Sequence, residues 1–97
     1  MLFAVSGIKN SGKTTLITKL LPIFKQNGLK VATIKHDGHD FTGDVPGTDT
    51  FKHMASGAYG TAVFSKYRFM AVKQQRDVTE RDLCQLFPEA DLILLEG

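Results

Sequence analysis

Hydrophobic residues in this chain fall into short blocks separated by polar turns, and their spacing predicts strands and helices. Residues 2–5 and 92–95 are continuous apolar runs, which are typical of strands buried on both faces of a sheet. Residues 30–35 are rich in β-branched side chains and predict a further strand. From residue 13 to about residue 26, apolar residues recur with helical spacing. A strand, a helix and a strand in this order predict a right-handed crossover and a parallel pair of strands.

The middle of the chain predicts smaller elements. Residues 61–65 and 67–72 are two β-rich runs, which fit either a tight hairpin or one long bent strand. A short helix is expected over residues 51–56 with its cap at residues 49–50, and another over residues 79–87, which begin with a capping-box pattern. Together these elements predict an α/β fold of three layers with a mainly parallel sheet, to which a hairpin would add a mixed edge.

The turn between the first strand and the first helix carries a phosphate-binding pattern. Residues 7–14, Gly-Ile-Lys-Asn-Ser-Gly-Lys-Thr, read G-x-x-x-x-G-K-[ST], the P-loop motif. Glycines let the backbone turn so that its N–H groups face an anion, and the start of the following helix adds further attraction for phosphate. We therefore predict a fold like that of P-loop NTPases. The candidate nucleotide-binding residues are Gly7, Asn10, Ser11, Gly12, Lys13, Thr14 and Thr15.

Two carboxylates follow predicted strands. Asp37 comes shortly after the strand of residues 30–35, and Glu96 ends the last strand. Ligands of parallel α/β sheets bind beyond the carboxyl ends of the strands. We expect Thr14, Asp37 and Glu96 to hold Mg²⁺, and Asp37 and Glu96 to be the candidate catalytic residues that orient the attacking water.

The segment around Asp37 leaves other roles open. His36, His39 and either Asp37 or Asp40 would supply ligands for zinc, although their spacing matches no closed zinc pattern. Aspartate, glycine and histidine are also ordinary residues of a solvated loop. The sequence therefore favours Mg²⁺ or nucleotide chemistry here, with a plain loop second and zinc third.

Composition adds little to this picture. The chain has 97 residues, 42% of them hydrophobic, and a net charge of +2, which is too mild to indicate a nucleic-acid partner. Its single cysteine, Cys84, and its short apolar runs predict a cytoplasmic protein without a membrane span. We expect residues 1–97 to be one P-loop nucleotide-binding domain. A P-loop domain would continue into a helix after Glu96 and Gly97, so we expect this domain to be incomplete at its C-terminus, as the N-terminal part of a longer one.

Several motifs together resemble one family. The P-loop, the segment of residues 35–41, the turn of residues 46–50 followed by residues 55–58, and the last strand of residues 91–97 occur in the order seen in the molybdopterin-guanine dinucleotide biosynthesis protein B (MobB) family. The resemblance covers essentially the whole chain. It implies a dimeric GTP-binding protein with weak GTPase activity. Such a protein assists the guanylyltransferase that attaches GMP to molybdopterin.

The resemblance also carries residue roles. It implies that Gly12, Lys13, Thr14 and Thr15 hold the phosphates and Mg²⁺, and that Asp37 and Glu96 complete the metal and water environment. The family places His36, His39 and Asp49 near the nucleotide or the cofactor surface. Guanine preference is implied by the resemblance alone, because the residues show no base-recognition motif.

Two other classes fit the P-loop. One is a small-molecule kinase or a general ATPase, which shares the phosphate and Mg²⁺ residues. A kinase lid is usually rich in arginine, whereas this chain has only Arg68, Arg76 and Arg81. The other is a binding module that delivers a nucleotide or cofactor with almost no turnover, and the MobB family lies close to it.

Overall fold

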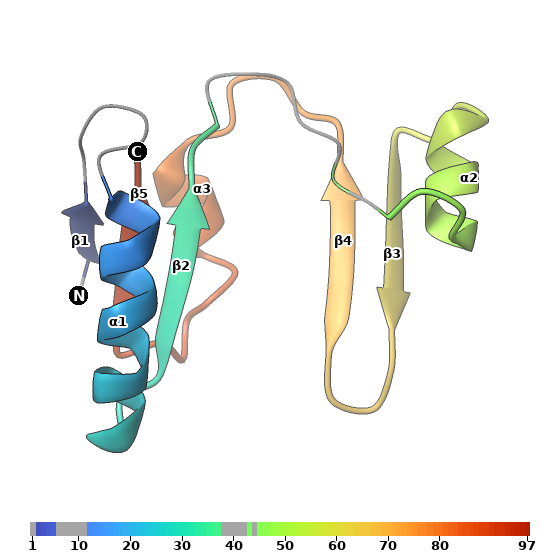
Figure 1. Cartoon of the computed structure of the whole chain (residues 1–97). Coiled ribbons are helices and arrows are strands. Elements are labelled where there is room, and N and C mark those ends of the chain that lie inside the picture. Colours follow the sequence, from blue (N-terminus) through green and yellow to red (C-terminus); the bar gives the residue numbers. More distant parts are fainter. Residues whose placement is uncertain (1, 6–11, 38–42, 44) are drawn as a thin grey trace. The chain divides into compact units, whose positions relative to one another are not determined.

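The computed structural model describes residues 2–5, 12–37, 43 and 45–97 (Figure 1). The chain divides into two compact units, the first of residues 1–38 and 78–97 and the second of residues 39–77. The elements follow the order β1 (Leu2–Val5), α1 (Lys13–Gln26), β2 (Val31–Lys35), α2 (Asp49–Ala55), β3 (Gly60–Phe64), β4 (Phe69–Lys73), α3 (Glu80–Cys84) and β5 (Leu92–Glu96). None of the helices in these ranges is long and apolar enough to cross a membrane.

The first unit holds a parallel sheet in the order β1-β5-β2. The prediction that β1 and β2 pair with each other is wrong, because β5 lies between them. β5 is almost wholly apolar, and such a strand is stable at a position where both of its faces are covered. The register aligns Val5, Glu96 and Lys35, so the three strands end at the same edge.

Helix α1 covers one face of this sheet. Ile17 packs with Leu92 and Leu94, and the partly buried residues around them are Leu21, Phe24 and Val31. Side chains alternate along a strand, so Ile93 faces the opposite side, where it lines a shallow pocket with Arg81 and Cys84 of α3. Figure 1 likewise shows α1 and α3 on opposite faces of the sheet. The predicted three layers are therefore confirmed for this unit.

The bounds of α1 agree with the prediction, and its end has a physical cause. Asn27 and Gly28 predict a stop. Gly28 adopts a left-handed φ of 75° and donates to the Lys25 carbonyl, while Leu29 donates to the Phe24 carbonyl over 3.0 Å. This pair of bonds is the Schellman arrangement, which satisfies the last helical carbonyls. The chain thereby turns directly into β2.

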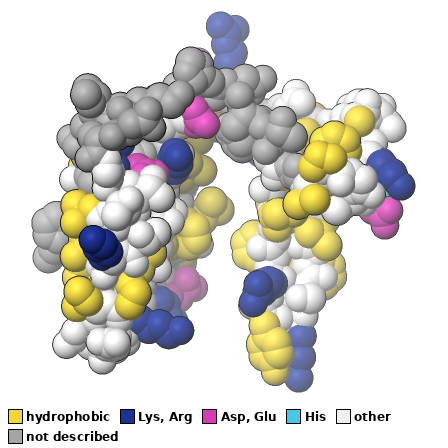
Figure 2. Space-filling view, viewed as in Figure 1, with side chains coloured by type: hydrophobic (Ala, Val, Ile, Leu, Met, Phe, Trp, Pro, Cys, Tyr) yellow, Lys and Arg dark blue, Asp and Glu magenta, His cyan; other side chains and the backbone are white. Residues whose placement is uncertain are grey.

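The second unit contains the hairpin. β3 and β4 pair antiparallel, and the Ser65 amide donates to the Arg68 carbonyl over 2.9 Å to close the turn. This excludes one long bent strand. The two strands form a sheet of their own, so among the described strands the parallel sheet has no mixed edge. Figure 2 shows hydrophobic side chains along this hairpin with basic side chains, lysine or arginine, beside them. Phe64 is 83% exposed.

Two short helices differ from their predicted bounds. Helix α2 begins at Asp49 because the Thr48 hydroxyl, one residue before it, accepts from the Phe51 amide over 3.4 Å. The predicted cap at residues 49–50 is therefore wrong. Helix α3 has the predicted capping box, with Thr79 and Asp82 bonded in both directions, but it ends at Cys84 and the chain continues in turns.

Candidate functional site

The candidate site lies where the N-terminus of α1 meets the carboxyl ends of β5 and β2. Gly12 precedes α1 with a left-handed φ of 86°, and a β-carbon there would meet no atom within 4 Å. The need for glycine is thus conformational rather than steric. The Leu16 amide donates to the Gly12 carbonyl over 2.9 Å, which starts the helix immediately after the turn. The first N–H groups of a helix lack intrahelical acceptors and attract anions, so this end of α1 suits a phosphate.

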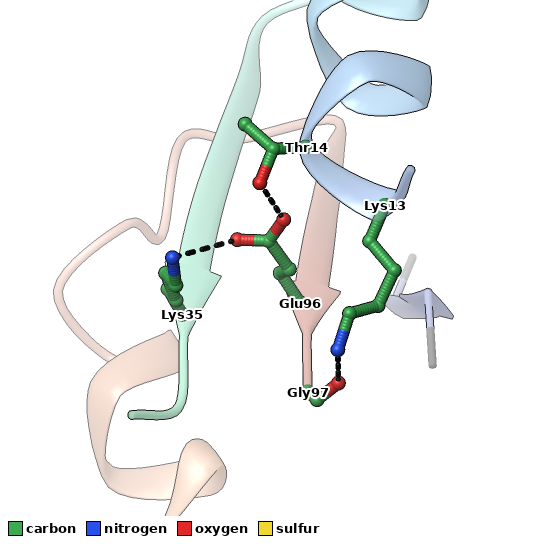
Figure 3. A network of polar contacts seen from close by, with 5 residues as sticks. All are labelled: Lys13, Thr14, Lys35, Glu96 and Gly97. Carbon is green, nitrogen blue, oxygen red and sulfur yellow. Dashed lines mark hydrogen bonds and ion pairs between the residues drawn. The ribbon is translucent and has the colours of Figure 1, made fainter. Parts of the chain in front are cut away.

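The carboxylate of Glu96 lies at the centre of a polar network (Figure 3). The Thr14 hydroxyl donates to Oε1 of Glu96 over 2.5 Å. The Lys35 ammonium lies 3.6 Å from Oε2 of the same carboxylate. Lys13 donates from Nζ to the Gly97 carbonyl. Residues from opposite ends of the sequence therefore meet at one edge of the sheet.

Glu96 is only 8% exposed, and its surroundings favour the charged form. The hydrogen bond from Thr14 lowers the pKa of the Glu96 carboxyl, and the positive charges of Lys35 and Lys13 lower it further, although burial opposes them. The carboxylate therefore stays ionised at neutral pH, with its charge compensated by the network.

The side-chain oxygens of Thr14 and Glu96 are suitable ligands for a magnesium ion. A threonine hydroxyl that gives its hydrogen to a carboxylate keeps its lone pairs for another partner. Thr14 and Glu96 thus offer neighbouring oxygen ligands, the kind that Mg²⁺ prefers. Lys13 stands at the same edge with an ammonium group suited to a phosphate oxygen.

The structure brings together some of the predicted site residues and not others. Lys13, Thr14 and Glu96 meet in one network. Asp37 is exposed and follows His36, whose amide donates to the Glu96 carbonyl over 2.9 Å. Thr15 is exposed, and its carbonyl accepts from the Thr18 hydroxyl over 2.9 Å. The predicted residues outside the described ranges are Gly7, Asn10, Ser11, His39 and Asp40.

The remaining predictions concern zinc and Asp49. Within the described residues, no three His, Cys, Asp or Glu side chains gather to hold a metal ion. The zinc alternative includes His39 and Asp40, which lie outside these residues. Asp49 is the exposed first residue of α2 in the second unit.

Sequence reasoning missed Lys35. It is the last residue of β2 and is aligned with Glu96 in the parallel register. The available signal was a pair of strands that both end in a charged residue, one basic and one acidic. This signal becomes informative only when β2 and β5 are known to be neighbours.

Comparison with known proteins agrees with this geometry. Residues 2–97 match the family described as Molybdopterin guanine dinucleotide synthesis protein B, MobB. The chain belongs to the MobB family. The predicted resemblance is therefore confirmed, and so is the fold class that it implied.

Individual MobB relatives are identical to this chain at about a third of the aligned positions. The molybdopterin-guanine dinucleotide biosynthesis adapter protein of Escherichia coli (strain K12) is 37% identical over 101 residues, which cover 99% of this chain and 58% of that protein. The protein of the same name from Haemophilus influenzae is 30% identical over 99 residues, which cover 99% of this chain and 56% of that protein. The crystal structure of Bacillus subtilis MobB superposes with a TM-score of 0.78 at 32% identity, over 99% of this chain and 60% of that one. The chain thus spans somewhat more than half the length of these MobB relatives.

Proposed function

We propose that this MobB-family chain binds GTP with Mg²⁺ and acts as an adapter in the formation of molybdopterin guanine dinucleotide. The observation that carries the proposal is the Thr14–Glu96 pair at the start of α1. A hydroxyl and a carboxylate beside a helix N-terminus provide a place for a cation that accompanies a phosphate. The names of the relatives point to the same pathway.

In this proposal the P-loop holds the phosphates. Lys13 neutralises the outer phosphates, and Thr14 and Glu96 hold Mg²⁺ with help from Asp37. The ion would supply charge neutralisation of the phosphates when it is bound. The remaining phosphate-binding residues are Gly7, Asn10, Ser11, Gly12 and Thr15.

Turnover would be slow. The Glu96 carboxylate already accepts from Thr14 and faces Lys35, and its lowered pKa makes it a weak base. In this proposal Asp37 is therefore the residue that orients the attacking water. A weak Mg²⁺-dependent GTPase suits an adapter, which needs to bind and release rather than to turn over rapidly.

The proposed partners follow from the same pathway. The adapter would assist the guanylyltransferase that joins GMP to molybdopterin, or would contact molybdopterin itself, and would do so as a homodimer in the cytoplasm. A net charge of +2 gives no reason to add a nucleic acid to these partners.

Isothermal titration of the full chain with GTP and with ATP, each with Mg²⁺, tests the proposal. We expect a clear preference for GTP. Equal binding, or a preference for ATP, would overturn the guanine assignment and favour a general ATPase or a small-molecule kinase.

A turnover assay separates these classes further. With the guanylyltransferase absent and then present, we expect tight GTP binding and slow phosphate release. Rapid phosphate release by the chain alone would indicate an NTPase. Transfer of phosphate to a small hydroxyl compound would indicate a kinase.

A further inference from the structure

Lys35 occupies a position in the site that the proposed function does not use. It ends β2, and the register places it directly beside Glu96 of β5. Figure 3 shows its ammonium group pointing at the Glu96 carboxylate from the side opposite to Lys13. The distance from Nζ to Oε2 is 3.6 Å.

The two oxygens of Glu96 therefore have different partners on different elements. Oε1 accepts from Thr14 of α1, and Oε2 faces Lys35 of β2. A glutamate has several rotatable bonds, and fixing it costs conformational free energy. One partner on each oxygen restrains the rotation of the carboxylate, whereas Thr14 alone would leave it free to pivot about a single bond.

The exposure of the pair indicates what Lys35 does. The Lys35 side chain is 65% exposed while that of Glu96 is 10% exposed. An ion pair with one solvated partner adds little to folding stability. Its effect is therefore expected on the orientation of the buried carboxylate and not on the stability of the unit.

We propose that Lys35 is a positioning residue, which orients the Glu96 carboxylate toward the divalent cation that accompanies the nucleotide. The inference rests on the proposed function, since it needs a nucleotide-bound cation at Thr14 and Glu96. Lys35 acts through Glu96 and does not touch the nucleotide. Residues that orient a metal ligand are the outer-shell partners whose loss weakens metal binding.

The test compares GTP affinity in EDTA with GTP affinity in saturating Mg²⁺, measured by titration calorimetry on the full chain. The ratio of the two affinities is the metal enhancement. We expect Lys35→Ala to leave the EDTA affinity within about twofold and to reduce the metal enhancement about tenfold, the lower end for an outer-shell partner. Lys35→Arg keeps the charge and should restore most of the enhancement. Lys30→Ala removes an exposed lysine directly before β2, at the end of the strand opposite to Lys35; it is the matched control and should match wild type.

A second arm shows whether Lys35 acts through Glu96. In the Glu96→Gln background, adding Lys35→Ala should cause no further loss of metal enhancement, because the carboxylate is already absent. A further loss would overturn the proposal. So would an equal loss of affinity in EDTA and in Mg²⁺, which would mean that Lys35 contacts the nucleotide, or an unchanged enhancement, which would mean a solvated pair without a role.

The two proposals fail in different ways. If the wild-type chain shows no Mg²⁺-enhanced GTP binding, the proposed function fails, and the role of Lys35 fails with it. If the wild type shows the enhancement and Lys35→Ala retains it, only the role of Lys35 fails. Circular dichroism of each variant checks that the fold is kept.

Discussion

At the scale of single residues, Glu96 is a nearly buried carboxylate whose charge is compensated by neighbours from two other elements. A buried charge is tolerated only when it is hydrogen-bonded or paired, and the hydrogen bond from the Thr14 hydroxyl meets that need, with the solvated Lys35 ammonium facing the other oxygen. An acid at the end of the last strand could be predicted from the sequence, as could the Thr14 hydroxyl. Lys35 could not, because its nearness to Glu96 depends on strand order.

The lowered pKa of Glu96 predicts how stability depends on pH. Because the pKa of Glu96 is lower in the folded state, Glu96 stabilises the fold above its ordinary, unfolded pKa, and this contribution is lost as the pH falls through the lower folded value. Glu96→Gln cannot titrate and lacks this loss. Urea unfolding of both proteins between pH 7 and pH 3 should therefore show their free energies of unfolding converging at acidic pH. Parallel curves would contradict the assignment.

In the proposed function Lys13 supplies a positive charge to the phosphates, so its removal should weaken nucleotide binding. Loss of a hydrogen bond to a charged group costs about 1.5–3 kcal/mol, or roughly ten- to a hundredfold in affinity. We expect Lys13→Ala to weaken GTP binding by this factor in a titration. Lys19→Ala, an exposed lysine on the same helix, is the control and should bind like wild type. Unchanged affinity in Lys13→Ala would refute the P-loop assignment.

At the scale of elements, local signals in the sequence predict which helices and strands form, but they do not predict how the strands pair. The bounds of α1, the capping box of α3 and the strand-forming runs follow from side-chain spacing and caps, which are contained in a few neighbouring residues. The position of β5 between β1 and β2 depends on contacts across some 60–90 residues, which no local pattern specifies. The cap of α2 is Thr48 and not residues 49–50. The sequence could not decide between them, because these adjacent residues can all serve as caps.

The conformation of Gly28 indicates how much the turn at the C-terminus of α1 contributes to the stability of the fold. Its φ of 75° lies in the left-handed region, and a β-carbon there would contact no atom within 4 Å. Gly28→Ala should therefore lower the free energy of unfolding by about 1–2 kcal/mol through backbone strain alone. Asparagine tolerates this conformation, so Gly28→Asn should lose less. Urea unfolding measures both, and equal losses would argue against a conformational origin.

At the scale of the whole molecule, the 97 residues divide into two compact units, and few of the side chains that the structure describes are buried. In the described part of the chain the buried hydrophobic residues are Ile17, Ile34, Leu92 and Leu94. Domains of this size bury a smaller fraction of the surface of their unfolded chain than larger domains do, and they are only marginally stable. The division into two units was not predicted, because the spacing of apolar residues indicates elements and not which of them pack together.

Because the core is small, the stability of the chain depends strongly on each residue in it. Leu94 is 3% exposed and packs with Ile17 of α1, so Leu94→Ala should cost about 2–5 kcal/mol, a large part of the total stability. Phe64 of the hairpin is 83% exposed, and Phe64→Ala should change stability by about 0.5 kcal/mol or less. Urea unfolding of the full chain, followed by circular dichroism, measures both variants at several protein concentrations. A loss for Phe64→Ala as large as that for Leu94→Ala would mean that Phe64 is buried in solution. If that loss grew with protein concentration, the aromatic residues of the hairpin would be covered by a second copy of the chain, since only an intermolecular contact depends on concentration.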